Sequence, residues 1–149
     1  MKRNIFVSWL GPNDVFSFEK GRTNPGPFRS FLLSDLFAGL SFTDTMLLMD
    51  AQEVTEKEVC TFIGKLDEGC RKRLGAITSH FLSVESPYHY PSIYALAKDL
   101  LEKTESSILE SGDEVAWSFY TAPGTRIMGD VLLLLGKTKF FAENIYSAY

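Results

Sequence analysis

The chain has 149 residues, of which 45% are hydrophobic and 23% charged, and its formal net charge is −4 at neutral pH. This length fits one domain that buries about two-thirds of its unfolded surface and folds without a disulfide or a metal. The composition is that of an ordinary soluble globular protein, and the acidic balance argues against a general nucleic-acid coat protein, which would be basic overall.

The first half of the chain alternates between apolar runs and helical patterns. We expect a first buried strand at 4–10, a long loop at 15–27, a helix at 28–37, a second strand at 44–49, a helix at 54–74 and a third strand at 76–84. Pro27 suits the first turn of a helix, and Thr55 with Glu58 matches a capping box.

The second half continues the alternation. We expect a loop at 85–91, a helix at 92–109, a fourth strand at 115–120, a helix at 125–135 and a last strand at 140–147. The strands lack polar alternation, which is typical of strands covered on both faces. The sequence therefore predicts an α/β fold: a Rossmann-like, doubly wound, mainly parallel sheet of five or more strands with helices on both faces.

The chain ends on an apolar strand with no closing helix. We therefore expect residues 1–149 to be a single sensor domain that forms the N-terminal part of a longer protein. The alternative is a complete small protein that ends in an edge strand.

Neither a leader nor a membrane span is expected. The positively charged start is followed by only a short apolar run, and no segment approaches the about eighteen apolar residues of a span. Cys60 and Cys70 lie on one predicted helix, about 15 Å apart, which is too far for a disulfide, and no histidine cluster accompanies them. We expect reduced cysteines, no metal, no cofactor, no membrane partner and a cytoplasmic location.

The most informative segment is the strand, turn and helix at 115–135. Its turn reads Tyr-Thr-Ala-Pro-Gly-Thr-Arg at 120–126. Backbone N–H groups at a helix N-terminus have no partner within the helix, and the helix dipole favours negative charge there. Because ligands of open parallel sheets bind outside the carboxyl ends of the strands, the loops at 11–14, 50–52, 86–90 and 121–126 are candidates for one site.

Eleven residues of these loops are the candidate ligand-binding residues: Gly11, Asn13, Asp14, Tyr88, His89, Thr121, Ala122, Pro123, Gly124, Thr125 and Arg126. We expect Arg126 to pair with a phosphate and the aromatic residues at 88–90 to stack on bases. Asn13 and Asp14 are candidates to read a ribose or a base edge. The alternatives are that 88–90 is a packed loop and that Asp14 only caps a turn.

Several enzyme templates are absent. The chain has no G-x-G-x-x-G, no G-x-x-x-x-G-K-[ST] and no G-x-S-x-G motif. It has two histidines, His80 and His89, so options for general acid–base catalysis are few, and His80 is expected to be a hydrogen-bonded structural residue within a strand. Catalysis by placing a ribose hydroxyl against its own phosphate stays open.

The motif Tyr-Thr-Ala-Pro-Gly-Thr-Arg-Ile-Met at 120–128, with the leucine-rich helix and Lys-Thr-Lys-Phe at 137–140, resembles the signature turn of CRISPR-associated Rossmann-fold (CARF) domains. It is most similar to the CARF-like sensor domains at the N-terminus of bacterial enhancer-binding transcriptional activators, of which the regulator of the RNA-repair operon is the best-known type. Leu-Gly-x-x-Asp at 10–14 and Gly-Pro-Phe at 26–28 resemble the family's first-strand turn and the start of its first helix.

The resemblance implies a homodimer that binds a cyclic oligoadenylate or another RNA-derived ligand across the dimer. It places these residues in the pocket: Gly11, Asn13, Asp14, Thr121, Gly124, Thr125 and Arg126. Two positions depart from the family pattern. Arg126 stands where many cyclic-oligoadenylate binders have lysine, which replaces a compact ammonium with a planar fork, and Pro123 removes one backbone donor from the turn.

Three functions follow as hypotheses. The first is a ligand-sensing regulatory domain that controls a fused effector, most simply a transcriptional activator. The second is a ring nuclease that cleaves cyclic oligoadenylate, with Thr121, Thr125 and Arg126 holding the scissile phosphate. The third is a protein-interaction or dimerisation domain without a small ligand. Because the sequence offers no strong general base, sensing without catalysis is the preferred interpretation.

Overall fold

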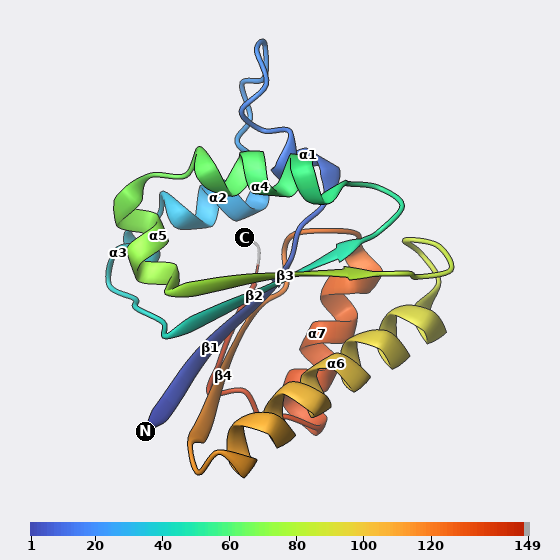
Figure 1. Ribbon diagram of the computed structural model, residues 1–149. Helices are drawn as coiled ribbons and strands as arrows, with labels where there is room; N and C mark the ends of the chain where they lie inside the picture. The colour runs from blue at the N-terminus through green and yellow to red at the C-terminus, as the bar shows by residue number, and fades with distance from the viewer. Residues whose placement is uncertain (148–149) are drawn as a thin grey trace.

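A five-stranded sheet organises the described part of the chain, residues 1–147 of the computed structural model. The strands are β1 (Lys2–Trp9), β2 (Asp44–Asp50), β3 (Ala76–Leu82), β4 (Glu114–Tyr120) and β5 (Asn144–Tyr146). Their spatial order is β3-β2-β1-β4-β5, and every neighbouring pair is parallel. The chain first builds outward from β1 to β3 and then crosses to the other side of β1, so the order reverses between β1 and β4 (Figure 1).

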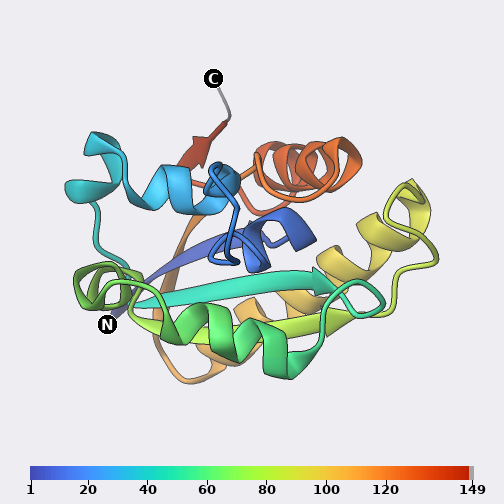
Figure 2. The ribbon, with the colours of Figure 1, turned by 90° about the horizontal axis from the view of Figure 1, so that it is seen from above.

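Helices cover both faces of this sheet (Figures 1 and 2). One face carries α1 (Pro12–Val15), α2 (Gly26–Leu32), α3 (Asp35–Ala38), α4 (Glu56–Gly64) and α5 (Glu68–Leu74). The other carries α6 (Tyr90–Glu110) and α7 (Arg126–Thr138). The predicted α/β class and its doubly wound parallel sheet are therefore confirmed. None of the helices within residues 1–147 is long and apolar enough to cross a bilayer.

The residues of β1 show why the strands carry no polar alternation. Ile5, Val7 and Trp9 are buried in the core beneath α6 and α7, whereas Phe6 is buried in the core beneath α2 to α5. Phe6 stacks on the ring of Phe42 with 4.8 Å between centroids. A strand that contributes to two cores has to be apolar at successive positions.

Tyr120, the last residue of β4, joins the sheet to the helix layer beside the site. Its ring stacks on Phe31 of α2 at 4.5 Å between centroids, and its hydroxyl donates a hydrogen bond to the carbonyl of Pro27 at 3.0 Å. The start of α2 is thereby held next to the end of β4.

The prediction of one helix at 54–74 is wrong, because the structure has two helices there, α4 and α5. α4 begins with the predicted capping box, in which Glu58 N–H donates to Thr55 Oγ1 at 3.2 Å and Thr55 N–H donates to Glu58 Oε1 at 2.9 Å. It ends at Gly64, Leu66 turns into the core with 5% of its surface exposed, and α5 begins after Asp67. Cys60 and Cys70 thus lie on different helices; both are free thiols.

Other boundaries also differ from the sequence predictions. The helix predicted at 28–37 is divided at Ser34, whose hydroxyl accepts a hydrogen bond from Phe37 N–H and so starts α3. The loop predicted from Val15 onward follows a short helix, α1. The strand predicted at 140–147 is only β5, because α7 runs on to Thr138 and Phe140 is buried against the ring of Trp117 at 5.7 Å. His80 lies in β3 as predicted, with Nε2 2.9 Å from the Thr78 hydroxyl.

Candidate functional site

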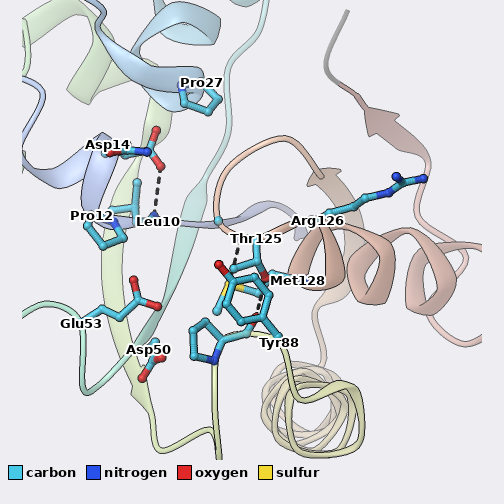
Figure 3. Close-up of a pocket in the computed structure, with 14 residues that line it drawn as sticks. Leu10, Pro12, Asp14, Pro27, Asp50, Glu53, Tyr88, Thr125, Arg126 and Met128 are labelled. Atoms are coloured by element: carbon cyan, nitrogen blue, oxygen red, sulfur yellow. Dashed lines mark hydrogen bonds between the residues drawn. The ribbon is translucent and has the colours of Figure 1, made fainter.

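A pocket of about 440 Å³ opens at the carboxyl edge of the sheet, beside the point where the strand order reverses (Figure 3). The loops that follow β1, β2, β3 and β4 all contribute to it. Its lining residues are Leu10, Gly11, Pro12, Asn13, Asp14, Pro27, Asp50, Glu53, Pro87, Tyr88, Gly124, Thr125, Arg126 and Met128.

Seven of the eleven candidate residues meet in this pocket. They are Gly11, Asn13, Asp14, Tyr88, Gly124, Thr125 and Arg126. They come from three loops far apart in the sequence, which the parallel topology brings to one edge. The pocket therefore unites most of the residues that the four-loop argument selected.

The other four candidates lie outside the pocket lining. His89 caps α6, where its Nδ1 accepts from Ser92 N–H at 3.2 Å, and its Nε2 lies 3.3 Å from the Glu85 carboxylate. Thr121 continues the pairing with β5, since its N–H donates to the carbonyl of Tyr146 at 2.9 Å. Ala122 packs against the core beneath α2 to α5, and Pro123 is buried.

The turn into α7 has the geometry of an anion site. Gly124 has φ +83, and a Cβ there would lie 2.8 Å from Met128 Sδ, so the turn requires glycine. Thr125 caps the helix by accepting from Met128 N–H at 3.3 Å. Within residues 1–147 no acceptor contacts the backbone N–H groups of Arg126 or Ile127. These two donors begin a helix of 13 residues whose dipole favours negative charge at this end.

Tyr88 stands beside this helix start. Tyr88 is 70% exposed and lines the same pocket as Thr125 and Met128 (Figure 3). The loop that carries it is fastened to α7, because the Thr125 hydroxyl donates to the carbonyl of Pro87 at 2.6 Å. A positioned, exposed aromatic ring at a pocket mouth is suited to stacking against a base.

Asp14 has a different environment from the one expected of a residue that reads a ribose. It is 1% exposed, and both of its oxygens are used by the backbone: Oδ2 accepts from Gly11 N–H at 3.0 Å and Oδ1 from Phe28 N–H at 2.9 Å. Burial raises the pKa of this carboxyl, against the lowering effect of the two N–H groups. Asp14 therefore holds the β1–α1 turn to the start of α2 and shapes the pocket rim.

Arg126 contributes its backbone to the pocket, while its guanidinium points elsewhere. The side chain is 94% exposed, its Nε lies 4.0 Å from Asp130, and in Figure 3 it extends away from the other lining residues. The expected pairing of this side chain with a phosphate inside the pocket is not present in this geometry.

Two acidic residues of the pocket were not among the candidates. Asp50 ends β2, is 3% exposed and accepts from Gln52 N–H at 2.9 Å. Burial, and secondly the charge of Asp50, raise the pKa of the Glu53 carboxyl. An aspartate directly after a buried strand was the available sequence signal, since 50–52 is one of the four loops. Glu53 lies one residue beyond it.

No protein-family model matches the sequence, and no curated protein matches it. Among solved structures, the fold is similar to that of Csm6 from Enterococcus italicus bound to cyclic hexa-2′-fluoro-hexa-dAMP, with a TM-score of 0.61 and 12% sequence identity. The match covers 92% of this chain and 31% of the Csm6 chain. The likeness is one of fold, and it supports the CARF-like fold that the sequence resemblance implies. This match does not support the resemblance to enhancer-binding activators.

Proposed function

We propose that this chain is a sensor domain that binds a cyclic oligoadenylate, or a related RNA-derived ligand, in the pocket at the carboxyl edge of the sheet. The observation that carries the proposal is the pair of N–H groups at the start of α7 that no acceptor within residues 1–147 contacts, beside the exposed ring of Tyr88. Such a helix start binds a phosphate, and the ring receives the adjacent base. The fold likeness to Csm6, whose structure holds a cyclic adenylate analogue, supports the same ligand class.

The size of the pocket indicates how a cyclic ligand is held. About 440 Å³ accommodates a nucleotide or two and is too small for a ring of four or six nucleotides. We therefore propose a homodimer in which two pockets share one ligand, and a fused effector, most simply a transcriptional activator, that responds to it in the cytoplasm. A monomeric mass by light scattering at micromolar concentration, with and without ligand, would contradict the dimer.

Two variants of one residue test the phosphate site. Arg126→Ala removes the side chain and keeps the N–H, whereas Arg126→Pro removes both. Proline fits the first helical position, and Thr125 already has ψ 162, which a following proline accepts. In titration calorimetry with cyclic tri-, tetra- and hexa-adenylate and with RNA ending in a cyclic phosphate, we expect Arg126→Pro to weaken binding about tenfold more than Arg126→Ala. No heat from any ligand with the folded wild type would overturn the proposal.

A ring nuclease is the second candidate, favoured by the carboxylate of Glu53 in the pocket. Its raised pKa suits a general base. Glu53 would take the proton of a 2′-hydroxyl, whose oxygen then bonds to the adjacent phosphorus. The bond from phosphorus to the 5′-oxygen breaks, the 5′-oxygen takes a proton from water, and a 2′,3′-cyclic phosphate remains. Labelled ligand that stays intact after hours with the wild-type protein would exclude this activity.

A further inference from the structure

The pocket has two electrostatically opposite ends. One wall carries the free N–H groups at the start of α7, and the other carries the carboxylates of Asp50 and Glu53 (Figure 3). The two carboxylates come from the end of β2 and the turn after it, where Glu53 N–H donates to the carbonyl of Asp50 at 3.0 Å. A ligand that fills this pocket therefore meets donors on one side and acceptors on the other.

Within residues 1–147, no basic side chain balances the acidic wall. No lysine, arginine or histidine within residues 1–147 forms an ion pair with Asp50 or Glu53. Asp50 is 97% buried, one of its oxygens accepts from Gln52 N–H, and no N–H group of the described chain reaches the carboxylate of Glu53. Gln52 N–H occupies only one oxygen of Asp50, and two adjacent carboxylates are unfavourable in a partly buried place when both are ionised, so this wall has acceptor capacity that a ligand donor can use.

These carboxylates also constrain what binds beside them. A phosphate at this wall would be repelled by both, which leaves the start of α7 as the place for the ligand's negative charge. The part of a nucleotide that faces Asp50 and Glu53 therefore has to be uncharged and has to donate hydrogen bonds. In a nucleotide, those donors are the ribose hydroxyls and the exocyclic amine of the base.

We propose that Asp50 and Glu53 are the nucleoside-recognising end of the pocket and accept hydrogen bonds from a ribose hydroxyl or an exocyclic amine of the nucleotide whose phosphate lies at the start of α7. The inference rests on the proposed function and adds to it the residues that select the nucleoside. Asp50 fixes Glu53 through the turn, and Glu53, being less buried, makes the more accessible contact.

Paired ligand and protein changes test this selection. Cyclic tetra-adenylate is compared with its 2′-deoxy analogue and with an analogue that lacks the exocyclic amine, by titration calorimetry on wild type, Glu53→Ala and Glu53→Gln. We expect Glu53→Ala to weaken binding of the parent ligand about tenfold. On wild type, the analogue that lacks the contacted donor should bind about tenfold more weakly than the parent ligand. On Glu53→Ala, that analogue and the parent ligand should bind equally well. Glu53→Gln, which keeps one acceptor oxygen, should be intermediate and serves as the measured variant if Glu53→Ala does not fold.

Glu56→Ala is the matched control, because Glu56 is exposed, lies three residues further on and does not line the pocket. It should leave both affinity and analogue preference unchanged. If wild type binds the parent ligand but Glu53→Ala binds it equally well or more tightly, this inference falls and the proposed function stands. If wild type binds no ligand, the proposed function itself fails. Binding that requires Mg²⁺ in wild type and not in Glu53→Ala would show that the acids hold a cation, which also overturns the inference.

Discussion

The hydroxyl of Thr125 donates a hydrogen bond to the carbonyl oxygen of Pro87 across 2.6 Å. The same hydroxyl oxygen accepts from Met128 N–H and so caps α7. One short side chain thus joins the helix start, where we place the phosphate, to the loop that carries the ring of Tyr88. Because Thr125 holds both the helix start and the loop of Tyr88, removal of its hydroxyl should disturb stability and site geometry together.

Thr125→Val removes the hydroxyl and keeps the shape of the side chain. Loss of an N-cap costs about 1 kcal/mol, and the lost bond to Pro87 adds a similar amount, so we expect the free energy of unfolding in urea to fall by about 1–2 kcal/mol. Amide hydrogen exchange at residues 86–89 should become faster. Thr125→Ser, which retains the hydroxyl, should stay within about 0.5 kcal/mol of wild type. Equal stability of the valine and serine variants would show that this hydroxyl does not couple the two elements.

Gly124→Ala tests the close approach in the turn. Gly124 has φ +83, and an added Cβ would lie 2.8 Å from Met128 Sδ and 3.2 Å from the Cβ of Trp9. Gly112 offers a control with φ +88 and nothing within 4 Å of an added Cβ. Both alanine variants carry the backbone penalty of about 1 kcal/mol, and only Gly124→Ala adds the clash.

We therefore expect Gly124→Ala to lose about 1–3 kcal/mol more than Gly112→Ala in urea unfolding, and to weaken ligand binding as well. If the two variants lose the same stability, the turn tolerates a methyl group and its glycine is required for another reason.

The sequence predicted most elements because their signals are local. The apolar strands and the Thr55–Glu58 capping box need no knowledge of distant residues. The break between α4 and α5 could not be predicted in this way, since Leu66 continues the apolar pattern and is buried whether or not the helix is interrupted. Phe140 was assigned to a strand for its apolar character, but its partner in the core is Trp117, which only the folded chain places beside it.

The candidate site could likewise be predicted only in part. The topology of a parallel sheet brings the loops after its strands to one edge, so the meeting of Gly11, Tyr88 and Gly124 followed from the order of elements. Side-chain direction did not follow. The side chain of Arg126 points away from the pocket. The carboxylate of Asp14 accepts a hydrogen bond from the N–H of Phe28, which comes 14 positions later.

Asp14 should support the site by holding together the two loops that form the pocket rim. In Asp14→Ala the buried N–H groups of Gly11 and Phe28 lose their acceptor, and each such loss costs about 1–3 kcal/mol, partly offset by the removal of a buried carboxylate. We expect a net loss of about 2 kcal/mol in urea unfolding. Asp14→Asn has one acceptor oxygen, which serves one of the two N–H groups, so its loss should be smaller. An alanine variant as stable as wild type would contradict the role of Asp14 as the link between the two loops.

The salt bridge between Arg3 and Asp44 should make stability depend on pH. The guanidinium donates Nε to Oδ2 at 2.9 Å and Nη2 to Oδ1 at 2.8 Å, joining β1 to the start of β2. The Arg3 hydrogen bonds hold the pKa of Asp44 below its ordinary value, against the effect of burial. The unfolded chain therefore binds this proton more readily, so the stabilisation is complete above the ordinary aspartate pKa and is lost as pH falls through the lowered value.

Asp44→Asn should accordingly be about 1 kcal/mol less stable than wild type at pH 7, and the difference should shrink below about pH 4. Urea unfolding at several pH values measures it. Asp99→Asn is the control, because Asp99 pairs with Lys103 at 2.9 Å on the surface with 63% of its side chain exposed, where such pairs contribute little. This control should match wild type throughout. A difference between Asp44→Asn and wild type that stays constant down to pH 3 would mean that the bridge stabilises the pairing of β1 with β2 by shape alone, since an effect of its charge has to diminish as Asp44 is protonated.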